Sequence, residues 1–223
     1  MFLAMDTVFD QCSIAILDSD GTIMFSQTEP GKRMQTQQIL PMIDVALSET
    51  QLKLVNIQAL VFNRGPGAFS GIRINTAVVQ ALSVAHDIPC VAISSLQAIA
   101  QNAYQEHRLT QVYSALDARM QQVYFGQYSL VDGIMQPVST KTEQLLDYDS
   151  QTELNIAIAG NGAELLSLHN EQVTYQSLNP NAATIGQLGI AQFKAKGGTD
   201  AANALPIYLR NQAWKTLKEQ GKT

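Results

Sequence analysis

The feature that most constrains the fold is an internal repeat of a hairpin pattern led by an aspartate. The segment YSALDARMQQVYFGQYSLVDGIMQPVST (113–140) echoes LAMDTVFDQCSIAILDSDGTIMFSQT (3–28). Asp6 and Asp117 each end a short apolar run, and an Asp-Gly turn then joins two candidate strands in each copy. The duplication predicts two related α/β domains, each with antiparallel strands extended by parallel ones.

The segments after the two hairpins are also similar. After the first hairpin the pattern predicts a helix at Thr36–Ser48, a buried strand at Ala59–Asn63, a helix ending near Ala85, a strand at 89–94 and a helix at Ser95–Tyr104. After the second hairpin it predicts a short helix at 142–148 and a buried strand at Leu154–Ala163. Gly160 and Gly162 fall in the second half where Gly65 and Gly67 fall in the first.

The glycine-rich stretch NRGPGAFSGIR (63–73) lies between a strand and a helix, where many proteins bind phosphate. It lacks the lysine of a P-loop, and Ser70 stands where a dinucleotide fingerprint needs glycine. We therefore interpret it as a tight structural turn in which Ser70 caps the following helix. The residues of this structural loop are Gly65, Pro66, Gly67, Ser70, Gly71 and Arg73.

Several local motifs together resemble a known family. The stretches AMDT and CSIAIL, QILPMI, NRGPGAFSGIRI, ALDARMQQVYFGQY and PIYLRNQAWK are similar to the TsaB (YeaZ) family of the actin/hexokinase/Hsp70 (ASKHA) superfamily. The resemblance implies two ribonuclease H-like α/β domains, with the second reduced. We expect residues 1–106 to form the first domain and residues 107–203 the second, with the segment 204–223 returning to the first.

The resemblance also implies a function. It predicts a scaffold subunit without catalysis of its own, needed for threonylcarbamoyladenosine modification beside the tRNA anticodon. The expected partners are a TsaD-type transferase and a TsaE-type ATPase, with a homodimer in isolation and tRNA contacted only through the complex. The rivals are an ATP-dependent kinase or ATPase of the same superfamily and a glycoprotease-like peptidase.

The two hairpin turns argue against a nucleotide site in the isolated chain. The superfamily places a glycine after each hairpin aspartate so that backbone can approach phosphate, whereas DTVFDQ and DARMQQ contain none. We expect no cofactor here, and ATP, ADP or a metal only at the complex. A weak anion site stays open as an alternative, at Asp6, Thr7, Ser13, Asp117 and Arg119.

Catalytic and metal-binding constellations are not found in the sequence. The three histidines are scattered and none forms the His-x-x-x-His pair with which TsaD holds its metal; the corresponding stretch here is RMQTQQILPM. We therefore predict no catalytic residue and no metal ligand. Asp6 and Asp117 either face each other across a cleft or cap their own turns, and we favour the capping role.

Two helical segments carry almost no charge. The segment from Ile74 to Ala85 contains no charged residue. It carries an apolar stripe that suits packing on the chain's own sheet and consists of Ile74, Val78, Leu82 and Ala85. The remaining apolar surface predicts a partner's helix pair, unless this chain covers it itself. The predicted interface residues are Ile39, Met42, Ile43, Ala46, Ile74, Ala77, Val78, Ala81 and Ala85.

Composition narrows the remaining possibilities. The net charge of −5 argues against direct binding of nucleic acid by this chain alone, because the phosphate backbone is also negatively charged. Cys12 and Cys90 lie in apolar runs, so we expect both to be buried free thiols. A charge at Asp6 interrupts any signal-peptide core, and no apolar run reaches membrane-spanning length, so we expect a cytoplasmic protein away from membranes.

The tail LPIYLRNQAW (205–214) is predicted to be an anchor. We expect Ile207, Leu209 and Trp214 to pack, and Tyr208 and Arg210 to form hydrogen bonds near the junction of the domains.

Overall fold

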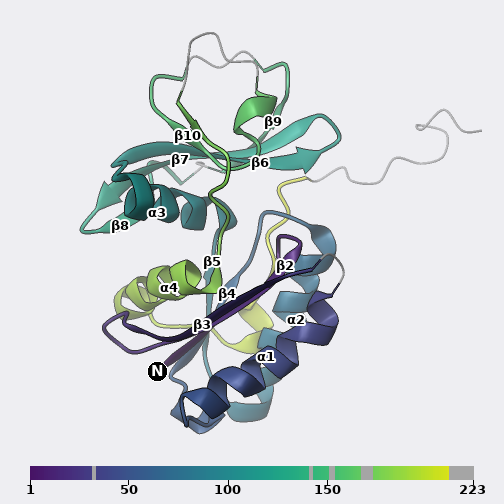
Figure 1. Ribbon diagram of the computed structural model, residues 1–223, viewed down its shortest axis with the longest axis vertical. Coiled ribbons are helices and arrows are strands. Elements are labelled where there is room, and N and C mark those ends of the chain that lie inside the picture. Colours follow the sequence, from purple (N-terminus) through teal and green to yellow (C-terminus); the bar gives the residue numbers. More distant parts are fainter. Residues whose placement is uncertain (32–33, 141–142, 151–153, 167–172, 211–223) are drawn as a thin grey trace, which may run out of the picture.

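The structure is a computed structural model that describes residues 1–31, 34–140, 143–150, 154–166 and 173–210. Within these residues the chain forms two β-sheets, one above the other in Figure 1. Helices α3 (Ser95–His107) and α4 (Ala182–Lys196) lie between the sheets. Helices α1 (Gln35–Glu49) and α2 (Phe69–His86) cover the outer face of the first sheet.

The first sheet has the strand order β3-β2-β1-β4-β5. Its strands are β1 (Phe2–Asp6), β2 (Gln11–Leu17), β3 (Ile23–Pro30), β4 (Ala59–Asn63) and β5 (Cys90–Ile93). β1 pairs antiparallel with β2 and parallel with β4. Every residue of β1 and β4 is buried, because helices cover both faces of the sheet.

The second sheet repeats this arrangement. Its strands are β6 (Gln111–Arg119), β7 (Gln122–Val131), β8 (Ile134–Pro137), β9 (Gln144–Asp147), β10 (Ile158–Ala159) and β11 (Thr174–Tyr175). The order β8-β7-β6-β10-β11 corresponds strand for strand to that of the first sheet, and β9 adds a further pairing with β7. The predicted duplication is confirmed. The second copy is the smaller one, since the 3-10 helix η2 (Ala163–Leu165) stands where the first copy has α2.

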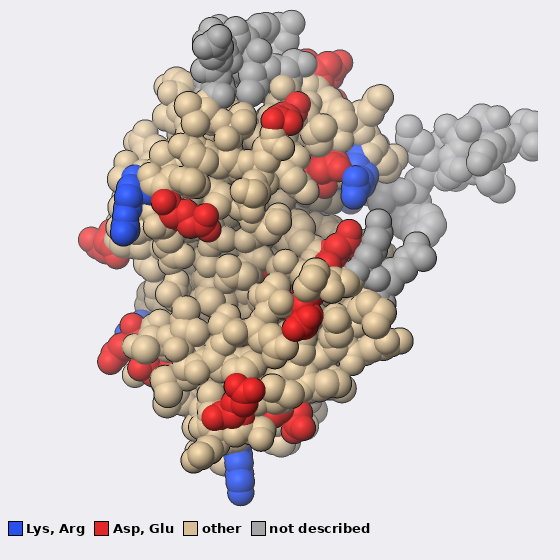
Figure 2. Space-filling view, viewed as in Figure 1, with Lys and Arg blue, Asp and Glu red and all other residues tan. Residues whose placement is uncertain are grey.

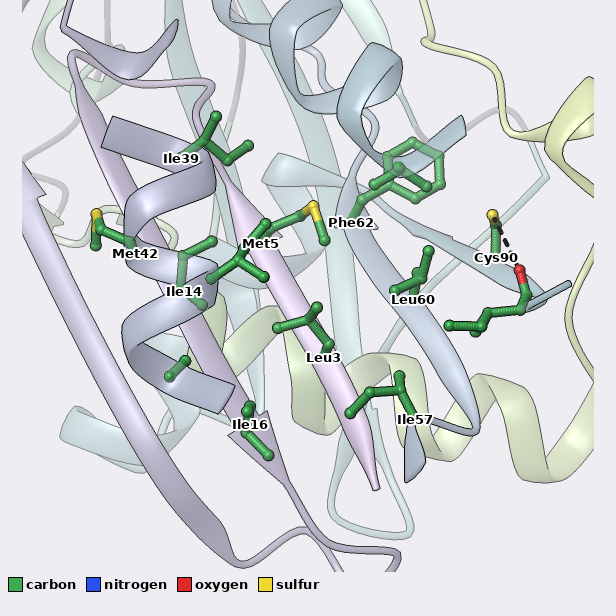
Figure 3. Packing of buried hydrophobic residues seen from close by; sticks show 14 of the residues in the cluster. Leu3, Met5, Ile14, Ile16, Ile39, Met42, Ile57, Leu60, Phe62 and Cys90 are labelled. Carbon is green, nitrogen blue, oxygen red and sulfur yellow. Dashed lines mark hydrogen bonds between the residues drawn. The ribbon is translucent and has the colours of Figure 1, made fainter. Parts of the chain in front are cut away.

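The main core of the first half lies between the first sheet and the outer helices. Ile39 and Met42 of α1 point onto the strands beside Met5 and Ile14 (Figure 3). α1 begins and ends within one residue of its predicted limits, and Pro41 lies inside it on the exposed side.

The last helix of each repeat crosses to the other sheet. α3 follows the first sheet in sequence, yet Leu96 and Ile99 pack with Leu116 in the core of the second sheet. α4 follows the second sheet, yet it packs on the first, close enough that a Cβ on Gly189 would overlap Val61. The division into 1–106 and 107–203 stays a prediction. By contacts, the first half of the molecule consists of the first sheet with α1, α2 and α4, and the second half consists of the second sheet with α3.

Two predicted elements of the second half are wrong. The segment predicted as a helix at 142–148 contains strand β9, whose backbone pairs with β7 from Gln122 to Phe125. The strand predicted at Leu154–Ala163 shrinks to Ile158–Ala159, because only these two residues pair with β6 and β11.

As far as Tyr208 the tail contacts the first half, and Arg210 contacts the second. Ile207 and Leu209 are half-buried, and the Tyr208 and Arg210 side chains form hydrogen bonds at the junction, as predicted. Trp214 lies outside the described residues. No helix in the described part of the chain has the length and apolarity needed to cross a membrane.

Candidate functional site

The glycine loop after β4 packs directly on the β1–β2 turn. The Thr7 hydroxyl donates a hydrogen bond to the Gly71 carbonyl oxygen at 2.8 Å. A Cβ on Gly71 would overlap the Thr7 carbonyl oxygen, and one on Gly67 would overlap the Val8 side chain. Gly65, with φ +93°, closes the turn in the left-handed region. These glycines permit close approach of chain to chain.

Helix α2 begins differently from the prediction. It starts at Phe69 with Ala68 as the N-cap residue, and no side chain caps it. Ser70, predicted as the cap, is exposed in the first turn. Arg73 is also exposed, with its guanidinium carbon 3.7 Å from the centroid of the Phe69 ring.

Asn63 is the polar centre beneath this loop, and the motif analysis missed it. Its Nδ2 donates to Asp6 Oδ1 at 3.1 Å, while its Oδ1 accepts from the Gly65 amide at 2.9 Å and the Ser95 hydroxyl at 2.8 Å. The signal that could have found it is a polar residue closing a wholly apolar strand. Asn63 thus ties together the end of β1, the glycine loop and the start of α3.

Asp6 is fully buried against Asn63. Its Oδ1 also accepts from the Val8 amide at 2.9 Å, and Oδ2 has no partner among the described residues. Burial raises the pKa of this carboxyl to about 7, although the hydrogen bonds from Val8 and Asn63 oppose the shift. Near neutral pH the site therefore holds a carboxyl that is part protonated, in a place that water does not reach.

The other residues of the predicted anion site divide between interior and surface. Thr7 and Ser13 are fully buried, and the Ser13 hydroxyl is occupied by Thr28 Oγ1 (2.7 Å) and the Ala182 amide (2.9 Å). In the second half, Asp117 and Arg119 form an ion pair at 2.8 Å with the arginine side chain 79% exposed. Asp6, Thr7 and Ser13 therefore lie in the interior, whereas the Arg119 side chain lies at the surface.

Asp6 and Asp117 play the same structural part in the two repeats. Each aspartate accepts a hydrogen bond from the amide two residues later, Val8 for the first and Arg119 for the second. Asp117 also accepts from the Tyr148 hydroxyl at 2.9 Å. Both carboxyls cap their own turns, which is the role favoured from the sequence.

The predicted interface residues lie in two different environments. Ile39, Met42, Ile43 and Ala46 of α1 are at most 5% exposed and belong to the chain's own core. Ile74 and Val78 of α2 are half-buried beside this core. The alanines at 77, 81 and 85 are exposed. The part of the predicted surface that a partner could reach therefore belongs mainly to α2.

The buried stripe of α2 also differs from the predicted one. The helix faces its sheet with Ile72, Asn75, Thr76, Val79 and Ser83 instead of the fully apolar stripe. Two of the polar members donate hydrogen bonds there, whereas Thr76 Oγ1 and Asn75 Oδ1 are buried without a partner among the described residues. Asn75 Nδ2 donates to the Asn63 carbonyl oxygen at 2.9 Å, and the Ser83 hydroxyl donates to the Ile88 carbonyl oxygen at 2.7 Å.

The exposed sides of α1 and α2 carry apolar side chains, here called the outer helix face, and the charged Asp44 of α1 is exposed beside them. Several large side chains point out of it, with Val84 77% and Leu40 56% exposed. The outer helix face consists of Leu40, Val45, Ala77, Ala81, Val84 and Ala85. Leu40, Val45 and Val84 were not among the predicted interface residues, and the large exposed fractions are what identify them.

Charge and metal-ligating groups are dispersed. On the face shown in Figure 2, Lys and Arg side chains lie scattered among acidic ones and form no basic patch. Among the described residues, no three His, Cys, Asp or Glu side chains come close enough together to hold a metal ion.

The paired sheets of matching strand order define the class of this protein, which is built from two ribonuclease H-like domains as in the actin/hexokinase/Hsp70 superfamily. A family model described as TsaD, tRNA N6-adenosine threonylcarbamoyltransferase, matches residues 28–217. Together with curated relatives and a solved structure that match nearly end to end, it shows that the chain belongs to the TsaB family, also named YeaZ.

The curated relatives match over nearly the whole chain. The tRNA threonylcarbamoyladenosine biosynthesis protein TsaB of Escherichia coli is 34% identical, over 96% of this chain and 97% of that protein. The protein of the same name from Haemophilus influenzae is 32% identical, over 96% of each. Among solved structures, YeaZ from Pseudomonas aeruginosa is 34% identical with a TM-score of 0.84, covering 93% of this chain and 99% of that one.

Proposed function

We propose that this chain is a cytoplasmic subunit of tRNA threonylcarbamoyladenosine biosynthesis that acts as a scaffold. It binds a TsaD-type transferase, which carries out the chemistry, and a TsaE-type ATPase joins the pair. Contacts with tRNA then come through the complex. The identity to proteins named for this pathway, spread over nearly the whole chain, supports the assignment.

The observation that carries the scaffold role is the outer helix face. α2 has no charged residue from Ile74 to Ala85, and its exposed side holds Ala77, Ala81 and Val84. Small side chains four residues apart let another helix come close. Exposed apolar groups gathered on neighbouring helices mark an interaction surface, and a stable interface buries roughly 800 Å² on each partner. A helix pair of the transferase is the proposed occupant, and a second copy of this chain covers the face in isolation.

An arginine at Ala81 tests this proposal. Ala81 is exposed, so Ala81→Arg leaves the fold intact but brings a charge into the centre of the interface. We expect binding to the TsaD-type subunit of the same organism to weaken about a hundredfold or more, since burying an unpaired charge costs several kcal/mol. Gel filtration and calorimetric titration measure the loss.

Ala195→Arg provides the matched control. Ala195 is exposed in the last turn of α4, on a helix outside the proposed interface. This variant should bind the transferase as the parent chain does. A complex that survives Ala81→Arg, with both variants folded by circular dichroism, contradicts the proposed surface.

We propose further that the isolated chain has no catalytic activity. The two carboxyls that a kinase of this superfamily would use cap their own turns, Asp6 at Val8 and Asp117 at Arg119. The glycine loop packs on the Thr7 turn, where such a kinase would bind phosphate. Calorimetry with ATP and Mg²⁺ should detect no micromolar binding to the chain alone. Micromolar binding would favour the kinase instead.

A further inference from the structure

A short C-terminal strap, residues Ala204–Arg210, follows the 3-10 helix η3 (Ala201–Asn203) and spans the junction between the two halves. As far as Tyr208 it lies on the first half. The contacts that hold it there are Gln80 Nε2 to the Ala204 oxygen (3.0 Å), the Ile207 amide to the Arg64 oxygen (2.9 Å), Arg73 Nε to the Tyr208 hydroxyl (3.3 Å) and the Phe69 ring against the Tyr208 ring (5.4 Å between centroids).

Two residues later the strap binds the second half. Among the described residues, the Arg210 guanidinium group contacts the β6–β7 turn. Nε and Nη2 donate to Gln122 Oε1 (3.1 and 2.7 Å), Nη2 donates to the carbonyl oxygens of Ala118 and Arg119 (3.1 Å each), and Nη1 contacts Met120 Sδ (3.1 Å). A planar guanidinium suits such a cluster of acceptors better than a lysine ammonium does.

The turn that Arg210 binds has an unfavourable backbone conformation. The backbone φ angles of the turn lie in the left-handed region, which residues other than glycine rarely adopt. They are 60° at Arg119, 55° at Met120 and 60° at Gln121. Asp117 Oδ1 accepts from the Arg119 amide at 2.7 Å, and the Gln121 oxygen accepts from the Tyr148 amide at 2.9 Å. Arg210 adds two charged bonds to carbonyl oxygens of the same turn, and such bonds are stronger than neutral ones.

The opposite ends of the strands also lie at the junction of the halves. A cavity of about 370 Å³ opens there between the β2–β3 turn, the β7–β8 turn, α3 and α4. Its polar and charged lining includes Asp20, Gln101, Tyr104, Gln187 and Lys194. Between this cavity and the strap, α3 meets α4 partly through polar pairs, such as Asn102 with Thr184. A rocking of the halves about this helix contact would change the gap that the strap spans.

We propose that the strap is a latch between the two halves. Closed on the β6–β7 turn, Arg210 fixes the angle between the halves and holds residues 119–121 in their left-handed conformation. When the latch opens, the halves rock about the α3–α4 contact and the turn relaxes. The latch belongs to the chain by itself, so it stands or falls independently of the proposed scaffold role.

The full chain carrying Arg210→Gln tests the angle. Spin labels are attached at Val55→Cys in the first half and Val131→Cys in the second, two positions that are 84% and 51% exposed. Cys12 and Cys90 are at most 1% exposed, so the labels go to the new thiols. We expect a broader distribution of label-to-label distances in Arg210→Gln than in the same labelled chain with Arg210.

Amide hydrogen exchange tests the turn in the same variant. The amides of Arg119 and Tyr148 should exchange on the order of tenfold faster or more, because both hydrogen bonds depend on the turn that Arg210 holds. Arg210→Lys should fall between the parent and Arg210→Gln. Gln122→Ala, which removes the shared acceptor, should reproduce both changes.

Arg108→Gln is the matched control. Arg108 is an exposed arginine whose guanidinium lies 5.9 Å from the centroid of the Tyr104 ring, away from the strap. It should alter neither the distances nor the two amides. The latch is overturned if Arg210→Gln and Gln122→Ala leave both measurements unchanged, or if Arg108→Gln changes them equally.

Discussion

At the scale of single residues, Asp6 is the most informative group because burial disfavours the charged form that a carboxyl normally has at neutral pH. A carboxyl at the end of a central strand normally ionises near pH 4, but this one has a pKa of about 7. It is buried with one oxygen bonded and the other without a partner among the described residues. Such a group stabilises the fold when protonated and opposes it when ionised.

This conflict predicts how stability depends on pH. Because the folded pKa lies above the unfolded value of about 4, the folded state holds the proton more tightly, and the free energy of unfolding falls as pH rises from about 4 to about 7. Asp6→Asn removes the ionisation. The variant should gain stability over the parent as pH rises, by a few kcal/mol at pH 8, since each pKa unit is worth about 1.4 kcal/mol. Urea unfolding of both proteins at several pH values measures the difference.

Asp18 gives a control of opposite sign. The Thr22 amide lowers the pKa of this exposed carboxyl, so its contribution is present at neutral pH and is lost as pH falls through its folded pKa. Asp18→Asn should therefore lose stability relative to the parent as pH rises. If Asp6→Asn follows the same trend as Asp18→Asn, the account of Asp6 is wrong.

At the scale of elements, the approach of α2 to the β1–β2 turn depends on Gly71. A methyl group there would overlap the Thr7 carbonyl oxygen, which is backbone and cannot rotate away. Gly71→Ala should lower the free energy of unfolding by about 1–3 kcal/mol, the usual cost of overpacking. Ser70→Ala, one residue earlier, should change it little, because Ser70 is exposed and caps nothing. Chemical denaturation of the two variants tests both statements, and equal losses would contradict them.

The sequence predicts an element well where the local pattern of apolar residues determines it. It predicts an element poorly where pairing with a distant strand determines it. The limits of β4 agree with the prediction, and those of α1 agree within one residue, because apolar periodicity and flanking glycine mark them. β9 was wrongly predicted as a helix because its two adjacent leucines define no period, and only pairing with β7 makes it a strand. The inward face of α2 was missed because Asn75 and Ser83 become suitable for burial only through partners elsewhere in the fold.

At the scale of the whole molecule, the exchange of α3 and α4 could not be read from the sequence. Periodicity shows that a helix has an apolar face, but it does not say which sheet will cover that face. Ile185 and Leu188 of α4 would serve either sheet equally well by pattern. The contact with the first sheet depends on the close approach allowed at Gly186 and Gly189, which is visible only in three dimensions.

The exchange predicts that the two halves unfold together. Each sheet loses a covering helix if the other half unfolds, so neither should be stable alone. Differential scanning calorimetry of the full chain should show one transition whose calorimetric and van't Hoff enthalpies agree. Two resolved transitions would contradict this prediction, because each half would then stay folded without the helix that comes from the other repeat.

The same exchange has a consequence for the newly made chain on the ribosome. The first sheet is complete in sequence at Ile93, but the helix that seals its second face ends at Lys196. About a hundred residues must still be translated in between, which takes roughly 5–20 s at about 5–20 residues per second. During that interval Val61 and Val91 remain exposed on the nascent polypeptide, and chaperones that recognise apolar segments have time to bind there.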